Sequence, residues 1–161
     1  FWVNSDRYAK AVRAYVVALK QEKKARGEFF VSSGVEAAVF DTACYTETMA
    51  LATVSEAAIY CQGYMAGTVL EKRWLMPAGF QLSCLFTTHR QVEKTLDFLE
   101  SKGVDIDHFE EDIYWSCSET YKDFWGVHFT SSVDNGKPSG VCLGRPGDEQ
   151  HWVRPVLIDG M

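Results

Sequence analysis

The sequence lacks the short motifs that identify common enzyme classes. It contains no G-x-S-x-G nucleophile elbow, no glycine-rich phosphate-binding loop and no dinucleotide-binding fingerprint. Internal repeats, low-complexity tracts and recognisable linkers are absent too. No reaction therefore follows from the sequence, and we expect the whole chain, residues 1–161, to form a single domain.

Positive charge is also in short supply. The net charge is −6 and the sequence pI is near 5.2, which argues against a nucleic-acid binder or a protein of anionic membrane surfaces. The composition favours a protein partner or a small-molecule ligand, and homo-oligomerisation stays open. The sequence does not identify a cofactor.

Metal-binding and disulfide patterns are missing as well. The four histidines form no H-x-x-x-H or H-x-H pair and none lies at zinc spacing from a cysteine, so we expect no metal site, and only a site assembled from distant positions stays open. The five cysteines are scattered without a C-x-x-C motif. This pattern favours reduced thiols in a soluble protein of an intracellular, cytoplasmic compartment.

The stretch 46–74 is the most distinctive part of the chain. Its larger apolar residues recur at steps of three and four, which is the helical period. Thr53 begins a capping-box pattern, and Pro77 prevents continuation beyond the stretch. We therefore expect one helix from about Thr53 to about Arg73, a rod of about 30 Å.

The same stretch is long enough to be weighed as a membrane span. Residues 49–70 carry a pair of small residues four apart, and a basic and aromatic end follows. Glu56, Gln62 and a shortage of large aliphatic residues argue against insertion. A buried helix of a soluble domain is the preferred interpretation.

Gly63 and Gly67 lie four residues apart and would share one face of this helix. Glycine inside a helix costs about 1 kcal/mol relative to alanine, so the pair indicates a close approach. One interpretation is another backbone segment of the same domain. The other is a ligand-binding groove for a flat molecule or a partner helix.

The remaining first half also reads as helical. Asn4 or Ser5 can cap a helix that ends near Arg26, because Gly27 is a good helix stop. Its apolar stripe consists of Tyr8, Val12, Tyr15, Val16 and Leu19. Residues 29–45 fit a helix or a strand, and helix is favoured.

After Pro77 the pattern becomes β-rich. Alternating apolar residues predict a strand over 80–87, followed by a helix that Thr88 caps and Gly103 ends. Further strands are predicted at 113–117, 125–130, 140–143 and 152–158, with a hairpin turn at 134–137. The predicted fold is α+β: a helical N-terminal half packed on an antiparallel sheet of about four to five strands.

Thr88, His89 and Arg90 form the most suggestive candidate site. If a helix begins here, its free amides and dipole favour an anion, and Arg90 adds a clamp for a carboxylate or phosphate. The plainer interpretation is simple capping with exposed side chains. His128 alternates with Val127 and Phe129 and so faces the other side of its strand, where it is the candidate catalytic acid or base.

The acidic segment 105–112 invites a calcium interpretation because Asp105 and Asp107 are two apart. The third ligand would fall on Phe109, and no glycine follows in register. We therefore expect a solvated acidic loop.

Two functional hypotheses follow. The first is a non-catalytic ligand-binding or protein-interaction domain, or a subunit of a larger assembly, with Gly63 and Gly67 in its binding face. The alternative is a small enzyme acting on an anionic metabolite, in which His89 and Arg90 bind the anion and His128 moves a proton. Whether the protein is an enzyme stays open.

Overall fold

The computed structural model describes residues 14–27, 54–71, 73–119, 124–130, 133–134, 137–138 and 142–159, and the structural statements concern these residues. The helices are α2 (Glu56–Gly63) and α3 (Gly79–Ser101). The strands are β1 (Ala14–Val17), β2 (Glu22–Ala25), β3 (Ile113–Glu119), β4 (Phe124–His128), β5 (Val133–Asp134), β6 (Lys137–Pro138), β7 (Cys142–Arg145), β8 (Gln150–Val153) and β9 (Val156–Asp159).

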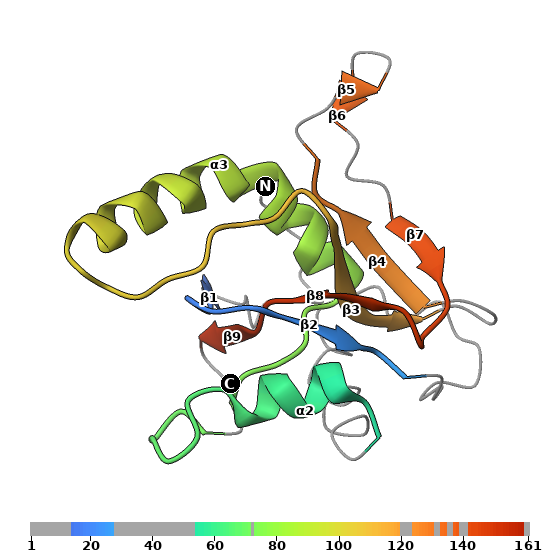
Figure 1. The fold of residues 1–161 in the computed structure, drawn as a ribbon, viewed down its shortest axis with the longest axis horizontal. Coiled ribbons are helices and arrows are strands. Elements are labelled where there is room, and N and C mark those ends of the chain that lie inside the picture. The colour runs from blue at the N-terminus through green and yellow to red at the C-terminus, as the bar shows by residue number, and fades with distance from the viewer. Residues whose placement is uncertain are drawn as a thin grey trace, which may run out of the picture.

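A mixed sheet of five strands forms the centre, in the order β2-β8-β3-β4-β7. Strand β3 runs parallel to β8, and the other neighbours are antiparallel. Two small pairs, β1-β9 and β5-β6, lie outside this sheet. Helix α3 lies on one side of the sheet and α2 on the other (Figure 1).

Side chains of β3 and β4 alternate between the two helices because successive residues of a strand point to opposite faces. Toward α3, Tyr114, Val127 and Phe129 pack with the helix residues Leu82, Leu85 and Phe86. The α2 side of the core is made by Ala57, Ala58, Cys61, Leu75, Met76, Ala78, Trp115, Cys117, Phe124, Val153 and Val156. The protein is of the α+β class, and the described part of the chain places one helix on each face of the sheet.

The predicted helical N-terminal half on an antiparallel sheet is wrong. Within the expected helix ending at Arg26, residues 14–17 form β1 and residues 22–25 form β2, which pair with β9 and β8. Arg26 is fully buried, and its guanidinium lies 4.1 Å from the Phe124 ring centre. Sheet pairing outweighs the local helical pattern here. Residues 4–13 and 29–45 lie outside the described residues.

The long central helix is also wrong, since α2 has 8 residues. Ser55, not Thr53, supplies the cap, and its Oγ accepts a hydrogen bond from the Ala58 amide at 3.2 Å. Turns follow the helix, with positive φ at Met65 and Gly67. Such φ values are incompatible with a continuing right-handed helix. Within the described residues, no helix is long and apolar enough to cross a membrane.

The strand predicted over 80–87 is the first part of α3. Ala78 precedes the helix, and its amide donates to the Gln81 side chain at 2.7 Å. The buried residues Leu82, Leu85 and Phe86 follow the helical period. The predicted helix end is confirmed, because α3 stops at Ser101 and Gly103 has a φ of +80°.

Most strand predictions in the second half are confirmed. β3, β4 and β7 lie at or within about two residues of their predicted positions, and Asp134 pairs with Lys137 across the predicted hairpin. The predicted last strand is instead two strands, β8 and β9, in different sheets. Arg154 and Pro155 separate them, which agrees with the poor fit of proline inside a sheet.

Arg154 is fully buried at this break and ties three chain segments together. Its guanidinium donates to the oxygens of Ala18 (2.8 Å), Leu19 (3.3 Å), Asp107 (2.6 Å) and the Gln21 side chain (3.0 Å). It also lies 4.3 Å from the centre of the Phe109 ring. Burial lowers the pKa of Arg154, since the charged form loses hydration.

We predict that Arg154→Met strongly destabilises the fold. The substitution leaves buried carbonyl oxygens without donors, and each such loss costs about 1–3 kcal/mol. Urea denaturation should show a fall of at least about 3 kcal/mol in the free energy of unfolding. The exposed Arg90 on α3 gives the control, and Arg90→Met should change the value by less than about 0.5 kcal/mol. Equal stability of both variants would contradict the anchoring role of Arg154.

The close backbone approach that the sequence suggested at Gly63 and Gly67 occurs elsewhere. A Cβ added at either of these two positions meets no heavy atom within 4 Å. At Gly147, by contrast, an added Cβ would overlap the Gly27 carbonyl and lie 2.9 Å from the Phe124 ring. The Gly27 amide also donates to the Gly147 oxygen at 2.8 Å.

This difference predicts opposite effects of two glycine-to-alanine substitutions. Gly147→Ala should lower the free energy of unfolding by about 1–3 kcal/mol, because the backbone of Gly27 must move. Gly63→Ala, at the open end of α2, should leave it unchanged or raise it by up to about 1 kcal/mol. Thermal or urea unfolding of both variants measures the contrast, and a destabilised Gly63→Ala would restore a packed role for that residue.

Candidate functional site

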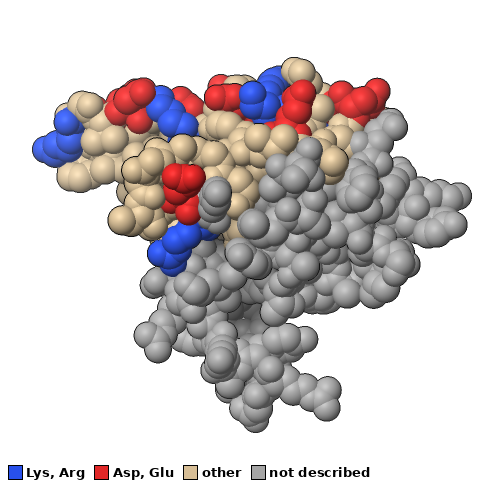
Figure 2. Space-filling view, turned by 90° about the horizontal axis from the view of Figure 1, so that it is seen from below, with Lys and Arg blue, Asp and Glu red and all other residues tan. Residues whose placement is uncertain are grey.

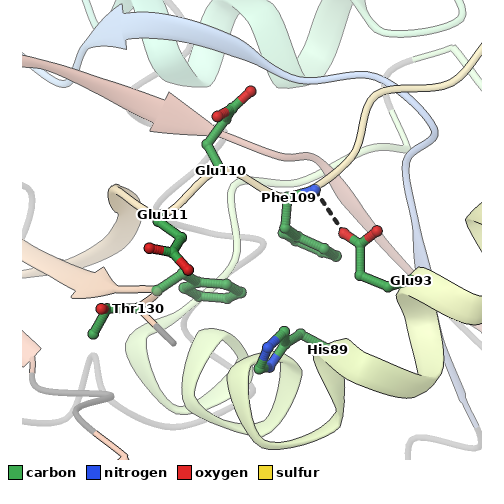
Figure 3. A pocket seen from close by; sticks show the side chains of 7 residues that line it. His89, Glu93, Phe109, Glu110, Glu111 and Thr130 are labelled. Atoms are coloured by element: carbon green, nitrogen blue, oxygen red, sulfur yellow. Dashed lines mark hydrogen bonds between the residues drawn. The ribbon is translucent and has the colours of Figure 1, made fainter. Parts of the chain in front are cut away.

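A hollow with a volume of about 140 Å³ lies where α3, the loop 104–112 and the end of β4 meet (Figure 3). Its lining consists of His89, Glu93, Phe109, Glu110, Glu111, Phe129 and Thr130. These residues come from three segments that are distant in sequence. The hollow is therefore a product of the tertiary fold.

His89 and Glu93 form the helix side of the hollow. They are four residues apart on α3 and so share one face of the helix. The Nδ1 atom of His89 contacts the Phe86 carbonyl oxygen, and the two rings stack with centroids 5.3 Å apart. A carbonyl oxygen only accepts, so Nδ1 carries the proton in this contact. The neutral imidazole then has its lone pair on Nε2.

The floor of the hollow is aromatic and held by the core. Phe109 and Phe129 stack with ring centroids 5.3 Å apart, and Phe129 lies 4.6 Å from the Tyr114 ring. Arg154 lies 4.3 Å from the Phe109 ring centre. Burial raises the pKa of Tyr114 well above its ordinary value. The floor is thus an extension of the packed α3 side of the sheet.

The loop 104–112 is pinned rather than simply solvated. Asp107 accepts from the Gln21 amide at 2.9 Å and pairs with Lys20 at 3.1 Å. The Glu93 carboxylate accepts from the Phe109 amide at 2.7 Å. The predicted solvated acidic loop is therefore correct for only part of the segment. Asp105 is one such residue, because its side chain is 88% exposed.

Two neighbouring glutamates of this loop point in different directions. In Figure 3 the Glu111 carboxylate lies on the inner side, facing the centre of the group of side chains, whereas Glu110 points away from His89. Among the residues that the structure describes, the lining contains three glutamates and no lysine or arginine. The hollow therefore offers hydrogen-bond acceptors and negative charge above an apolar floor.

The wider surface is mixed in charge. On the face that Figure 2 shows, Lys and Arg alternate with Asp and Glu among the described residues, without a large patch of one sign.

A second group of titratable side chains adjoins the hollow through Glu93. His108 Nδ1 lies 2.5 Å from Glu93 Oε2, and its Nε2 lies 3.5 Å from a Glu100 oxygen. The hydrogen bond to Glu93, with Glu100 adding to it, raises the pKa of His108 above 6.5 despite partial desolvation. Asp97 completes the group, since the ligand atoms of Glu93, Asp97 and His108 all lie within 4.8 Å of one another.

Of the predicted residues at the start of the helix, His89 alone lines the hollow. Thr88 does not cap a helix, because α3 began nine residues earlier at Gly79; its hydroxyl donates to the Cys84 carbonyl at 2.9 Å. Arg90 is exposed. The premise of an anion site at a helix N-terminus is therefore wrong.

His128 is not brought together with His89. Val127 and Phe129 face α3, so the alternation places His128 on the α2 side of the sheet. His128 is also not among the residues that line the hollow. Gly63 and Gly67 lie at and beyond the end of α2 and do not share a helical face.

The sequence did contain a signal for the residues that were missed. Glu93, Asp97 and Glu100 follow steps of four and three on a helix predicted with the correct end. Phe109 and Glu111 carried no comparable signal, because their place depends on the return of the loop to α3.

Comparison with protein-family descriptions, curated proteins and solved structures found no match for this chain. The functional argument therefore rests on the geometry alone.

The raised pKa of His108 predicts a pH-dependent contribution to stability. The folded state favours the protonated imidazole, so this contribution is complete below pH 6.5 and is lost as pH rises through the higher folded pKa. The stability difference between wild type and His108→Asn should thus be larger at acidic than at alkaline pH. Urea denaturation at a series of pH values between about 5 and 9 measures it, and a constant difference would contradict the assignment.

Proposed function

We propose that this protein is a non-catalytic binding domain that receives a positively charged side chain of a protein partner in the hollow beside α3. The observation that supports this most directly is the lining itself. Its described residues place glutamates on the walls and phenylalanines on the floor, and none of them is a lysine or an arginine. Lysine and arginine match such a surface, because their heads donate hydrogen bonds and their stems are apolar.

The size of the hollow favours a side chain over a whole metabolite. Pockets for small molecules usually measure about 300–1,000 Å³, whereas this one has about 140 Å³. A single lysine or arginine side chain needs less room than a metabolite. This comparison supports a protein-interaction role more than a small-ligand role.

The proposed arrangement assigns a task to each side of the hollow. The apolar stem packs on Phe109 and Phe129, and the charged head meets the Glu111 carboxylate. His89 contributes the Nε2 lone pair as a further acceptor when its ring is neutral. The stacking of His89 on Phe86 and of Phe109 on Phe129 orders these groups before binding, which lowers the entropic cost of association.

The alternative of an enzyme for an anionic metabolite has less support. An anion in this hollow would meet glutamates, and no lysine or arginine is present in the described part of the lining. His89 and His128 lie toward opposite faces of the sheet, so the arrangement does not provide the joint anion-binding and proton-transfer site that this alternative requires.

We predict that the protein binds Nα-acetyl-lysine amide in preference to its Nε-acetylated form, which has the same stem without the charge. Two-dimensional NMR should show saturable shifts at the amides of Phe109, Glu111 and Thr130 with the charged compound. Glu111→Gln should weaken this binding about tenfold, equal to about 1.4 kcal/mol, because a charge-assisted hydrogen bond is lost.

Glu110→Gln is the matched control. It removes the same charge at the neighbouring position, and the Glu110 side chain points away from His89. This variant should change the affinity for the lysine probe less than about twofold, because salt screens the interaction between the probe and an exposed charge that does not contact it. Equal binding of the charged and neutral compounds would refute the proposal. Equal losses in the two variants would show that net charge, rather than the hollow, attracts the probe.

A further inference from the structure

We propose that Glu93, Asp97 and His108 form a binding site for a divalent transition-metal ion, with Zn²⁺ as the best-suited ion. One ligand atom from each residue lies within 4.8 Å of the other two. The group combines two carboxylates with an imidazole, a donor set that Zn²⁺ uses. It adjoins the hollow through Glu93, but the inference does not depend on the proposed binding of a basic side chain.

The fold brings the three ligands together from two segments. Glu93 and Asp97 are four residues apart on α3, so they lie on one face. His108 reaches them from the loop 104–112, which Arg154 and Lys20 hold through Asp107. Ligand atoms about 2.1 Å from a tetrahedral ion lie about 3.4 Å apart, so small side-chain rotations close the observed spacing.

A separate observation concerns the groups behind the ligands. Histidines that bind metals usually direct the other ring N–H to a carboxylate or carbonyl. His108 Nδ1 faces Glu93, while Nε2 lies 3.5 Å from Glu100. Glu93 is itself oriented, since its second carboxylate oxygen accepts from the Phe109 amide at 2.7 Å. The Phe109 amide thus orients Glu93, and the Glu100 carboxylate lies near the other ring nitrogen of His108.

The ion would take the place of a proton. His108 Nδ1 and Glu93 Oε2 lie 2.5 Å apart and share a hydrogen in the protonated pair. A metal ion at this position separates the two atoms and binds both, so the proton on Nδ1 is released to solvent.

Three protein ligands and partial exposure set the expected character of the site. Tetrahedral Zn²⁺ would keep one position for water, as in sites with three protein ligands. Mg²⁺ prefers oxygen ligands in octahedral geometry and gains little from an imidazole. The site should therefore discriminate between the two ions.

Isothermal titration calorimetry of the full chain with ZnCl₂ tests the proposal, with MgCl₂ as competitor. We expect saturable binding of one Zn²⁺ per chain that excess Mg²⁺ does not displace. Asp97→Asn and His108→Asn should each reduce the affinity at least tenfold. Asp97 is exposed on α3, so circular dichroism should show an unchanged fold for Asp97→Asn.

His151→Asn is the matched histidine control, because His151 also contacts a glutamate, Glu149 at 2.8 Å. This variant should keep the wild-type affinity. Absence of saturable Zn²⁺ binding would overturn the proposal. Binding that survives both Asp97→Asn and His108→Asn would also overturn it, and would assign the ion to other groups such as the cysteines.

The variants also separate this inference from the proposed function. Glu111→Gln should weaken binding of the lysine probe and leave Zn²⁺ binding intact. Asp97→Asn should do the reverse. A failure of one proposal is thereby distinguishable from a failure of the other.

Discussion

The buried guanidinium of Arg154 is the interaction on which the rest of the structure depends. A buried charge is tolerable only when its hydrogen-bonding groups are satisfied, and here the acceptors come from the segment 18–21 and from Asp107. One side chain thereby fixes the break between β8 and β9, the turn between β1 and β2, and the loop that walls the hollow. The position of Phe109 at the surface follows from a contact made in the interior.

The parts of the fold that local signals specify could be predicted from the sequence. Strands β3 and β4 are rich in aromatic residues and each contains one β-branched residue, Ile113 or Val127, and the hairpin near Asp134 has a strong turn pattern. The end of α3 follows from Gly103, which adopts the positive φ that glycine tolerates. In each case the deciding residues are neighbours in sequence.

The errors arose where distant pairing decides the structure. Residues 14–25 match a helical stripe, yet their backbone groups pair with β8 and β9, which the segment itself does not reveal. Residues 80–87 alternate and also satisfy steps of three and four, so one pattern fits both a strand and a helix. Because of this ambiguity, the predicted helix began at Thr88, whereas α3 begins at Gly79. His89 therefore lies on the side of a helix and not at the helix N-terminus, where an anion site was expected. The loop position of His108 depends on tertiary contacts and had no local signature.

The two oxygens of the Glu93 carboxylate have different partners, and this has a thermodynamic consequence. One carboxylate oxygen orients the Phe109 amide, and thus a wall of the hollow, while the other faces His108. A proton or ion that redistributes charge on this carboxylate alters the strength of its bond to Phe109. Linkage requires reciprocity, so an occupant of the hollow that acts on Phe109 must change the proton or ion affinity at His108 by the same factor. The two places are neighbours in space and share the Glu93 carboxylate.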